Sequence, residues 1–261
     1  MYDGSILSIR VHMKNTLILF YAITFLFYFL TFGFCILRKK ILENLMALIG
    51  LIANVICMVV LMVWSGHAPV YRLFESLMLG ALILSVLGFL FSRQEGKIPD
   101  LRFWVWLEIL LIMGIAAFAR KEPSPFGYDY DDLYIIMFHA LRIAVVSLTL
   151  FSSALYIQSR FDSRNSNSLA FYRAHLGRNF LILGAALFFI AEYVGIHWCL
   201  RGWGDFWQWG AGFFQSTLIV MYFMLAVHIP GSNHRPGSWR PRLGIVSGFL
   251  ILALMAIRSI I

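Results

Sequence analysis

Three tryptophans and a phenylalanine lie within the seven residues Trp203-Gly204-Asp205-Phe206-Trp207-Gln208-Trp209. The stretch separates two apolar runs, and Gly210 and Gly212 follow it. Indoles collect at membrane surfaces because the ring prefers lipid while its N–H prefers water. An interfacial belt places only a few rings at each helix end, so two interpretations remain open. The stretch is either an unusually dense belt or a flat apolar shelf for a large planar ligand.

Four of the seven histidines lie inside an apolar run or at its end: His67, His139, His197 and His228. A lone histidine in such a place more often packs or hydrogen-bonds between helices than binds a metal. We expect the first three on the same side of the membrane as the aromatic stretch, and His228 near the opposite side. No two of the four are three or four residues apart, so the single-helix zinc motif is excluded.

Ionisable residues also lie inside the apolar runs, namely Glu75, Glu108, Arg142 and Glu192. Each costs about 2.5–3.5 kcal/mol on membrane-insertion scales and therefore needs a partner or a function. Arg142 follows His139 by three residues, so the two side chains share one helix face. Either Arg142 is neutralised by Glu192 or Glu108, or it holds a ligand carboxylate beside a metal-ligating imidazole.

One ligand suits an aromatic shelf, imidazoles and nearby cations. Haem has a flat macrocycle, an iron that takes histidine, and two propionates that bind arginine or lysine. A glycine-rich phosphate loop and a Ser–His–Asp arrangement are not recognisable in the sequence.

The composition places these residues in a polytopic membrane protein. Of 261 residues, 61% are hydrophobic and only 13% are charged, whereas soluble domains carry about 25% charged residues. The first apolar run is too long for a signal-peptide core and is expected to be retained. The three cysteines form no C-x-x-C pair and offer no disulfide framework. We attribute the net charge of +8 to cytoplasmic loops and not to nucleic-acid binding.

The predicted fold is all-α, with a single transmembrane domain over residues 1–261 and a Trp-rich outer loop at 199–212. Crossing the hydrocarbon layer takes about 20 apolar residues, and the backbone in lipid must be helical to satisfy its polar groups. Eight candidate spans meet this requirement: 16–37, 45–64, 73–92, 102–119, 134–157, 179–198, 212–229 and 243–260.

The distribution of lysine and arginine predicts the orientation of these spans. Thirteen such cations lie on one face of the predicted topology and seven lie on the other. Since cytoplasmic loops carry the excess, both termini and the Trp-rich loop are expected outside, which in a bacterial inner membrane is the periplasmic side.

Several of these residues together resemble the cytochrome c assembly family, the CcsA/ResC-type haem-handling proteins. The family motif W-G-x-x-W-x-W is matched from Trp203 to Trp209, and the following span ends at His228, as a family span ends near Y-L-H. Gly66-His67-Ala68-Pro69 and Phe74-Glu75-Ser76 match an upstream element, and His139 matches a histidine that opens the span two before the motif. These anchors run from about residue 64 to 229.

The resemblance implies a role in haem delivery. His228 would be the inner axial ligand of haem b and His139 an outer one, with Trp203, Trp207 and Trp209 as the shelf. The haem would pass to an apocytochrome c, with a CcsB/ResB-like second membrane subunit as partner and lipid around both. The chain would then be part of a holocytochrome c synthase, or haem lyase, complex.

The sequence also departs from the family pattern. Residues 210–213 read Gly-Ala-Gly-Phe, where the family has Asp-Pro-Lys-Glu, and no histidine follows the eighth predicted span. The second outer ligand is therefore expected from His197 or His67, with His197 preferred, or from a partner subunit. Haem binding survives these losses more easily than synthase activity, because a site with one axial ligand can still hold five-coordinate haem.

Two other functional classes stay open. A non-catalytic relative could bind haem, act as a scaffold or regulate assembly, and the lost Asp-Pro-Lys-Glu end favours this alternative. A small-solute transporter or an electron-transfer subunit is less favoured. Paired histidines at matched depths, which a cytochrome b needs, and duplicated halves, which many transporters show, are not evident.

Overall fold

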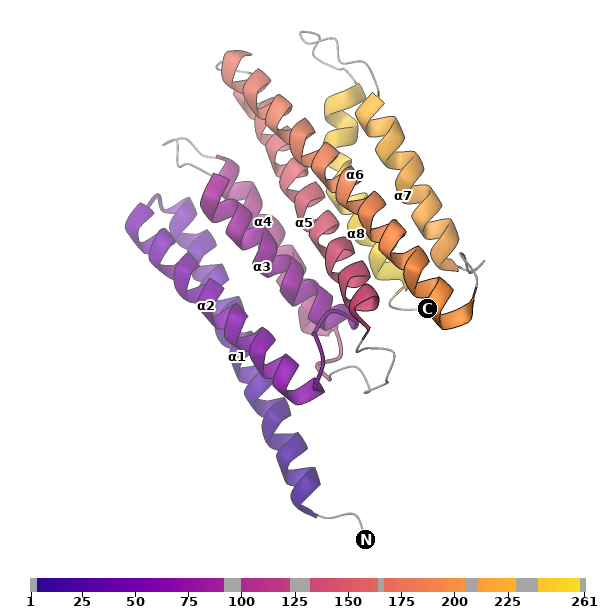
Figure 1. Cartoon of the computed structure of the whole chain (residues 1–261). Coiled ribbons are helices and arrows are strands. Elements are labelled where there is room, and N and C mark those ends of the chain that lie inside the picture. Colours follow the sequence, from indigo (N-terminus) through magenta and orange to yellow (C-terminus); the bar gives the residue numbers. More distant parts are fainter. Residues whose placement is uncertain are drawn as a thin grey trace.

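The computed structural model describes residues 4–91, 100–122, 132–163, 167–204, 211–228 and 239–258, and Figure 1 shows their arrangement. Over these residues the protein is built of helices and contains no strand, so the predicted all-helical fold is confirmed. The helices are α1 (Gly4–Ile36), α2 (Lys40–Ser65), α3 (Leu73–Phe91), α4 (Leu101–Phe118), α5 (Leu133–Asp162), α6 (Asn167–Trp203), α7 (Ala211–His228) and α8 (Trp239–Arg258).

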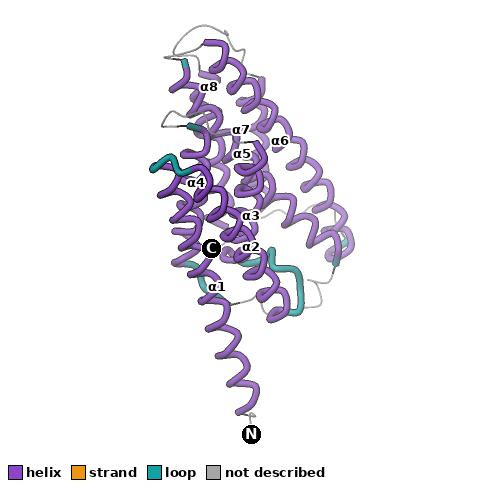
Figure 2. The backbone as a smooth tube through the Cα atoms, turned by 90° about the vertical axis from the view of Figure 1, so that its left-hand side faces the viewer, coloured by secondary structure: helices purple, strands orange, loops and turns teal. Residues whose placement is uncertain are grey.

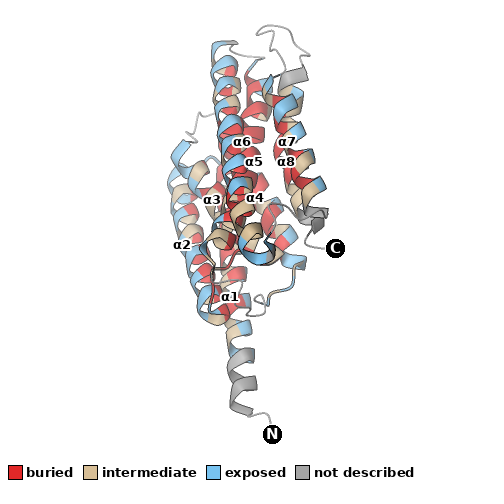
Figure 3. Ribbon diagram, turned by 45° about the vertical axis from the view of Figure 1, so that its right-hand side comes forward, coloured by how far each residue is buried: buried red, intermediate tan, exposed pale blue. Residues whose placement is uncertain are grey.

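Six of the described helices, α1 to α6, are long and apolar enough to cross a membrane, which makes the chain a polytopic membrane protein. The described apolar stretches of α7 and α8, Phe213–His228 and Pro241–Met255, are shorter. Large apolar side chains remain exposed on the outside of the bundle; on α2, Val63 is 70% exposed. Figure 3 shows exposed residues on the outer faces of the helices and buried residues between them. Because many of the exposed side chains are large and apolar, this outer surface is suited to contact with lipid.

One predicted boundary needs correction. The Trp-rich loop was placed at 199–212, but α6 continues to Trp203 and α7 starts at Ala211. Helix α6 also begins at Asn167, well before the predicted span at 179–198. This polar extension is stabilised where Arg173 pairs with the buried Asp162 of α5 at 2.5 Å. The hydropathy pattern marks the part of a helix that crosses lipid, and it misses turns that continue beyond the membrane.

The helix ends follow from residues with specific capping roles. Gly66 terminates α2 in the left-handed region at φ 75°, and its N–H donates to the carbonyl of Met62 at 2.9 Å. Asp100 caps α4 by accepting from the Phe103 N–H at 3.0 Å. Asp132 caps α5 in the same manner through the Tyr134 N–H at 2.7 Å. Each cap satisfies a backbone group that the first or last turn leaves unpaired.

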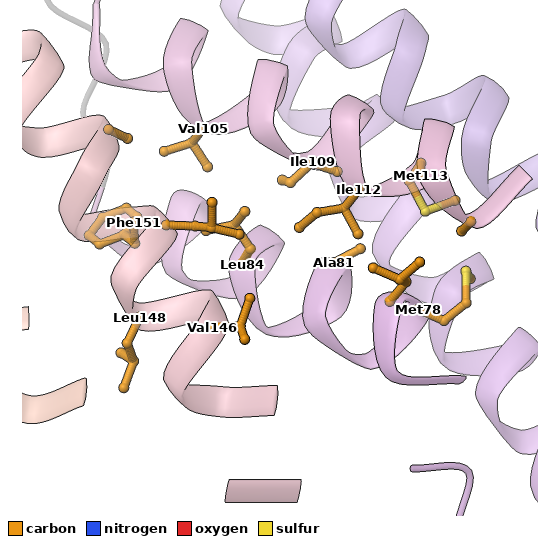
Figure 4. Packing of buried hydrophobic residues seen from close by; sticks show 14 of the residues in the cluster. Met78, Ala81, Leu84, Val105, Ile109, Ile112, Met113, Val146, Leu148 and Phe151 are labelled. Carbon is orange, nitrogen blue, oxygen red and sulfur yellow. The ribbon is translucent and has the colours of Figure 1, made fainter. Parts of the chain in front are cut away.

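The helices form two groups, α1 to α4 and α5 to α8, which meet where α3 and α4 pack against α5 (Figures 1 and 2). Helix α1 begins and α8 ends toward the same end of the bundle, which we call the terminal end. The core at the junction contains apolar side chains of α3, α4 and α5, shown in Figure 4: Met78, Ala81, Leu84, Val105, Ile109, Ile112, Met113, Val146, Leu148 and Phe151.

A buried polar cluster joins α2 to α4 near the end opposite to the terminal end. The Arg102 guanidinium donates to the Glu43 carboxylate at 3.0 Å and to the Asn44 side-chain oxygen at 2.9 Å. The Trp106 indole donates to the same carboxylate at 3.3 Å. Since both charges are buried, these hydrogen bonds compensate part of their desolvation.

Candidate functional site

A cavity of about 900 Å³ lies between the two helix groups, toward the terminal end. Its volume falls within the range of small-molecule and cofactor sites, about 300–1,000 Å³. The start of α3, the end of α4, and α5 to α8 all contribute to its wall. The lining residues that the argument uses are Tyr71, Arg72, Ile112, Arg120, His139, Arg142, Ile143, Val146, Trp198, Gln215, Leu252 and Met255.

The segment before α3 is held in place by Glu75. Its carboxylate accepts hydrogen bonds from the backbone N–H groups of Tyr71 and Arg72, at 2.9 and 3.1 Å. Arg72 precedes the first residue of α3, so Glu75 occupies the third helical position, where a capping-box glutamate reaches back to the cap. The Ser76 hydroxyl donates to the Val70 carbonyl at 3.1 Å. These bonds fix Tyr71 and Arg72 at the cavity wall.

His139 lies on α5, near the start of the helix, and lines the cavity. The Tyr71 ring meets its imidazole edge-on with centroids 5.3 Å apart, and the Phe138 ring does so at 5.2 Å. Phe138 in turn packs against Trp198 of α6 at 5.9 Å. Two aromatic rings thus contact the half-buried imidazole, and Trp198 supports one of them from α6.

His67 and His197 lie near His139, but neither lines the cavity. The buried His67 ring contacts Tyr71 at 5.2 Å, and its Nδ1 lies 3.0 Å from the Ala68 carbonyl oxygen. His197 packs between Tyr134 at 5.6 Å and Tyr193 at 4.8 Å. The structure therefore brings three of the predicted histidines to one end of the bundle, yet only one of them reaches the cavity.

Arg142 lies one helical turn deeper than His139, as the spacing predicted. Its Nε is 3.8 Å from the Glu192 carboxylate, and its Nη2 donates to the Ser216 hydroxyl at 3.4 Å. The guanidinium also lies over the Phe138 ring at 4.9 Å and the Phe188 ring at 5.5 Å. Of the two predicted alternatives, the pairing with Glu192 is present. Arg142 lines the cavity as well, from its buried position.

Glu108, the other carboxylate proposed for Arg142, forms no such pair. It is buried on α4, and neither of its oxygens has a hydrogen-bond partner among the described residues. It precedes the cavity-lining Ile112 by four residues and therefore lies on the same helix face.

Two arginines line the side of the cavity toward the terminal end, and we call this side, where Arg120 is exposed to solvent, the mouth. Arg72 and Arg120 both line it, and an Arg72 N–H donates to the carbonyl oxygen of Glu122 at 3.2 Å. The Lys14 ammonium donates to the Glu122 carboxylate at 3.0 Å, which lowers the pKa of that carboxyl. Burial lowers the pKa of Lys121, whose ammonium lies over the rings of Tyr21 and Phe74 at 5.1 and 5.7 Å.

The remaining predicted site residues lie elsewhere. His228 ends α7, is exposed, and places its Nδ1 2.9 Å from the Met224 carbonyl oxygen, at the end of α7 opposite to the one that enters the cavity. Trp203 is the last residue of α6, but its side chain is outside the described set; Trp207 and Trp209 lie outside the described residues altogether. The tryptophan shelf therefore stays a prediction.

Comparison with known proteins adds no identification. No protein-family model matches the chain, and no curated protein is similar to it at a significant level.

The residues of the cavity fit haem with one protein ligand. The part of the chain that the structure describes contains no group of three or more side chains suited to an isolated metal ion. It does contain one imidazole in a cavity with aromatic walls, an apolar interior and arginines. His139 would hold the iron, and the arginines would pair with propionates.

Sequence reasoning missed several lining residues. The sequence indicates Arg72 and Arg120 only as two of the seven cations on the predicted outer face, and no motif marks Trp198 or Gln215. Trp198 directly follows the predicted site residue His197, and Arg72 lies three residues after the Gly-His-Ala-Pro element. Their closeness to these predicted site residues is the sequence feature that could have identified them. The cavity forms where six helices, α3 to α8, meet. Because its walls come from segments distant in the sequence, no local sequence pattern predicts it.

Proposed function

We propose that this chain is a haem-handling subunit of a cytochrome c biogenesis system and that His139 holds haem b in the cavity. The observation that carries the proposal is the convergence of His139, three arginines and an aromatic wall on one cofactor-sized cavity. This combination matches an iron, two propionates and a macrocycle. The resemblance of the Trp-rich stretch and of the segment around His67 supports the same conclusion.

In the proposed topology the chain crosses a bacterial inner membrane eight times, with both termini and the cavity mouth on the periplasmic side. Support comes from the excess of lysine and arginine at the opposite end and from the common end at which α1 begins and α8 ends. The Trp-rich residues around Trp207 would then lie where an apocytochrome c and a CcsB/ResB-like subunit could reach them.

Each part of the site has a separate task in this proposal. The imidazole of His139 ligates the iron, and Tyr71 and Phe138 restrict its rotation through their edge contacts. The apolar residues Ile112, Ile143 and Val146 exclude water from the macrocycle. The bound haem supplies the vinyl groups to which cytochrome c thiols attach. Neither His197 nor His67 lines the cavity, so either would have to move to become a second iron ligand. A histidine of a partner subunit is therefore the simpler source of that second ligand.

Two observations favour a second candidate, a haem-binding relative without synthase activity. Residues 210–213 lack the acidic and basic groups of the family motif, and only one of the outer histidines lines the cavity.

Deletion and complementation in the host separate the two candidates. A synthase subunit predicts that deletion abolishes covalently bound haem in membrane c-type cytochromes and that the wild-type copy restores it. The His139→Ala copy should fail, whereas a His175→Ala copy should restore it, since His175 lies on the opposite part of α6. Unchanged cytochrome c in the deletion strain, together with a purified protein that binds haem, would select the non-catalytic relative.

A further inference from the structure

Resting on the proposed haem function, we propose that Arg72 and Arg120 form the subsite for the ligand's two carboxylates, and that Arg142 does not. The ligand class is therefore an amphiphile with two carboxylates at one edge and a flat apolar body. Its carboxylates face the cavity mouth, and its body points toward the interior of the bundle.

Arg142 is already committed to the protein. Its guanidinium has the Glu192 carboxylate at 3.8 Å and the Ser216 hydroxyl at 3.4 Å, and two phenylalanine rings lie against it. A ligand carboxylate at this position would be buried and would compete with Glu192 for one cation. Burying a second anion beside that carboxylate is unfavourable because like charges repel strongly where water is excluded.

Arg72 and Arg120 have donors left for a ligand. The Arg72 side chain donates one N–H to the Glu122 carbonyl oxygen at 3.2 Å, and a guanidinium has five N–H donors. Arg120 is exposed and forms no hydrogen bond or ion pair with any other described residue, although it lines the cavity. The Glu122 carboxylate, which also attracts both arginines, accepts a hydrogen bond from Lys14 at 3.0 Å. Two cations at one mouth repel each other unless an anion lies between them.

In the opposite orientation the carboxylates of the ligand would point toward the interior of the bundle. The apolar residues of the inner cavity wall disfavour that orientation. Ile112 and Val146 belong to the packed region between α4 and α5 (Figure 4), and both line the cavity together with the buried Ile143. A carboxylate placed there would lose its hydration, and the charged donor beside these residues, Arg142, already faces the Glu192 carboxylate. At the mouth it keeps contact with water and with two guanidinium groups.

The test compares haem with haem dimethyl ester, which keeps the iron and the ring but has no carboxylates. Both are titrated into the purified full-length protein in detergent, and binding is followed by the Soret absorption. The wild-type protein should prefer haem by tenfold or more, about the value of one charge-assisted hydrogen bond. In the Arg72→Gln/Arg120→Gln protein that preference should fall to near unity, while the residual Soret band keeps its position because His139 is unchanged.

Three controls make the result decisive. Arg201→Gln changes an exposed arginine that pairs with Asp132 and does not line the cavity, so it should keep the wild-type preference. The ratio of affinities is compared between proteins, because the ester's greater partition into detergent cancels in that comparison. If the double variant does not fold, Arg120→Gln alone serves, since the exposed Arg120 forms no bond with the described residues.

The outcomes separate this inference from the proposed function. If the wild type binds haem and its ester equally, or if the double variant keeps the preference, the carboxylate subsite is wrong and haem binding stands. If the folded wild type binds neither ligand, the proposed function itself fails. If Arg142→Gln alone abolishes the preference while the Arg72→Gln/Arg120→Gln protein keeps it, the carboxylates bind at Arg142.

Discussion

Glu75, Arg142 and Glu108 are three charges in apolar runs, and the structure gives each a different solution. Glu75 satisfies the backbone at the start of α3, and Arg142 pairs with Glu192. Glu108 stays buried without a hydrogen-bond partner among the described residues.

The capping role of Glu75 can be tested by two substitutions. Glu75→Ala should lower the free energy of unfolding by about 1 kcal/mol, because two backbone N–H groups lose their acceptor. Glu75→Gln should cost less, since glutamine also serves in a capping box. Thermal melting of the purified protein in one detergent compares the two. Equal melting points for both variants would show that the carboxyl oxygen does not act as a cap.

Residue-scale prediction succeeded where the signal was local. The spacing of His139 and Arg142 placed them on one helix face one turn apart, and Glu192 was one of two partners proposed for Arg142. Arg72 and Arg120 could not be recognised as cavity residues, because their role depends on helices that are distant in the sequence.

At the scale of the elements, small residues let α8 approach α5 closely. The Gly248 N–H donates to the Ser153 hydroxyl at 2.9 Å, and that hydroxyl donates to the Gly244 carbonyl at 3.1 Å. Close backbone approach through glycine and serine is typical of helix packing in membranes. A Cβ at Gly248 would lie 2.5 Å from the Leu150 Cα, so any larger residue must push the helices apart.

This packing predicts a matched pair of results. Gly248→Ala should destabilise the protein by about 1–3 kcal/mol, the usual cost of overpacking a core. Gly33→Ala should be neutral or slightly stabilising, because nothing lies within 4 Å of its Cβ position and alanine favours helix. Melting in detergent measures both. A neutral Gly248→Ala would mean that α5 and α8 are further apart than described.

The element boundaries show the limits of hydropathy. Helices α3, α4 and α7 begin and end within one residue of the predicted spans, because apolar length marks the crossing of lipid. Helix α2 begins five residues before its predicted span, and α5 ends five residues after its own. Hydropathy does not predict the polar first turns of α6 or its last turn at Trp203. The first turns continue beyond the lipid because polar side chains there find partners, as Arg173 does in Asp162.

At the scale of the whole molecule, α1 begins and α8 ends toward the same end of the bundle (Figure 1). The exposed Arg120 and residues at the starts of α3 and α5 line the cavity at this end. The arrangement in two groups, with a cavity where they meet, left no trace in the sequence, because no internal repeat marks the halves. The orientation in the membrane rests on the charge bias.

Single-cysteine labelling of spheroplasts tests that orientation. With the native cysteines replaced by alanine, Leu133→Cys at the terminal end should react with a membrane-impermeant maleimide. Ser163→Cys, exposed after the end of α5, should react only after the membrane is permeabilised. The reverse pattern would place the cavity mouth in the cytoplasm and contradict periplasmic haem handling.

The most direct measurement of the central claim is the Soret band of a His139→Gly protein, before and after imidazole is added. The account predicts that the band is lost or weakened and shifted in the variant and that imidazole, by entering the vacated position, restores the wild-type spectrum. A His175→Gly protein should be unchanged with or without imidazole. A wild-type spectrum in His139→Gly without added imidazole would contradict the claim that His139 ligates the iron.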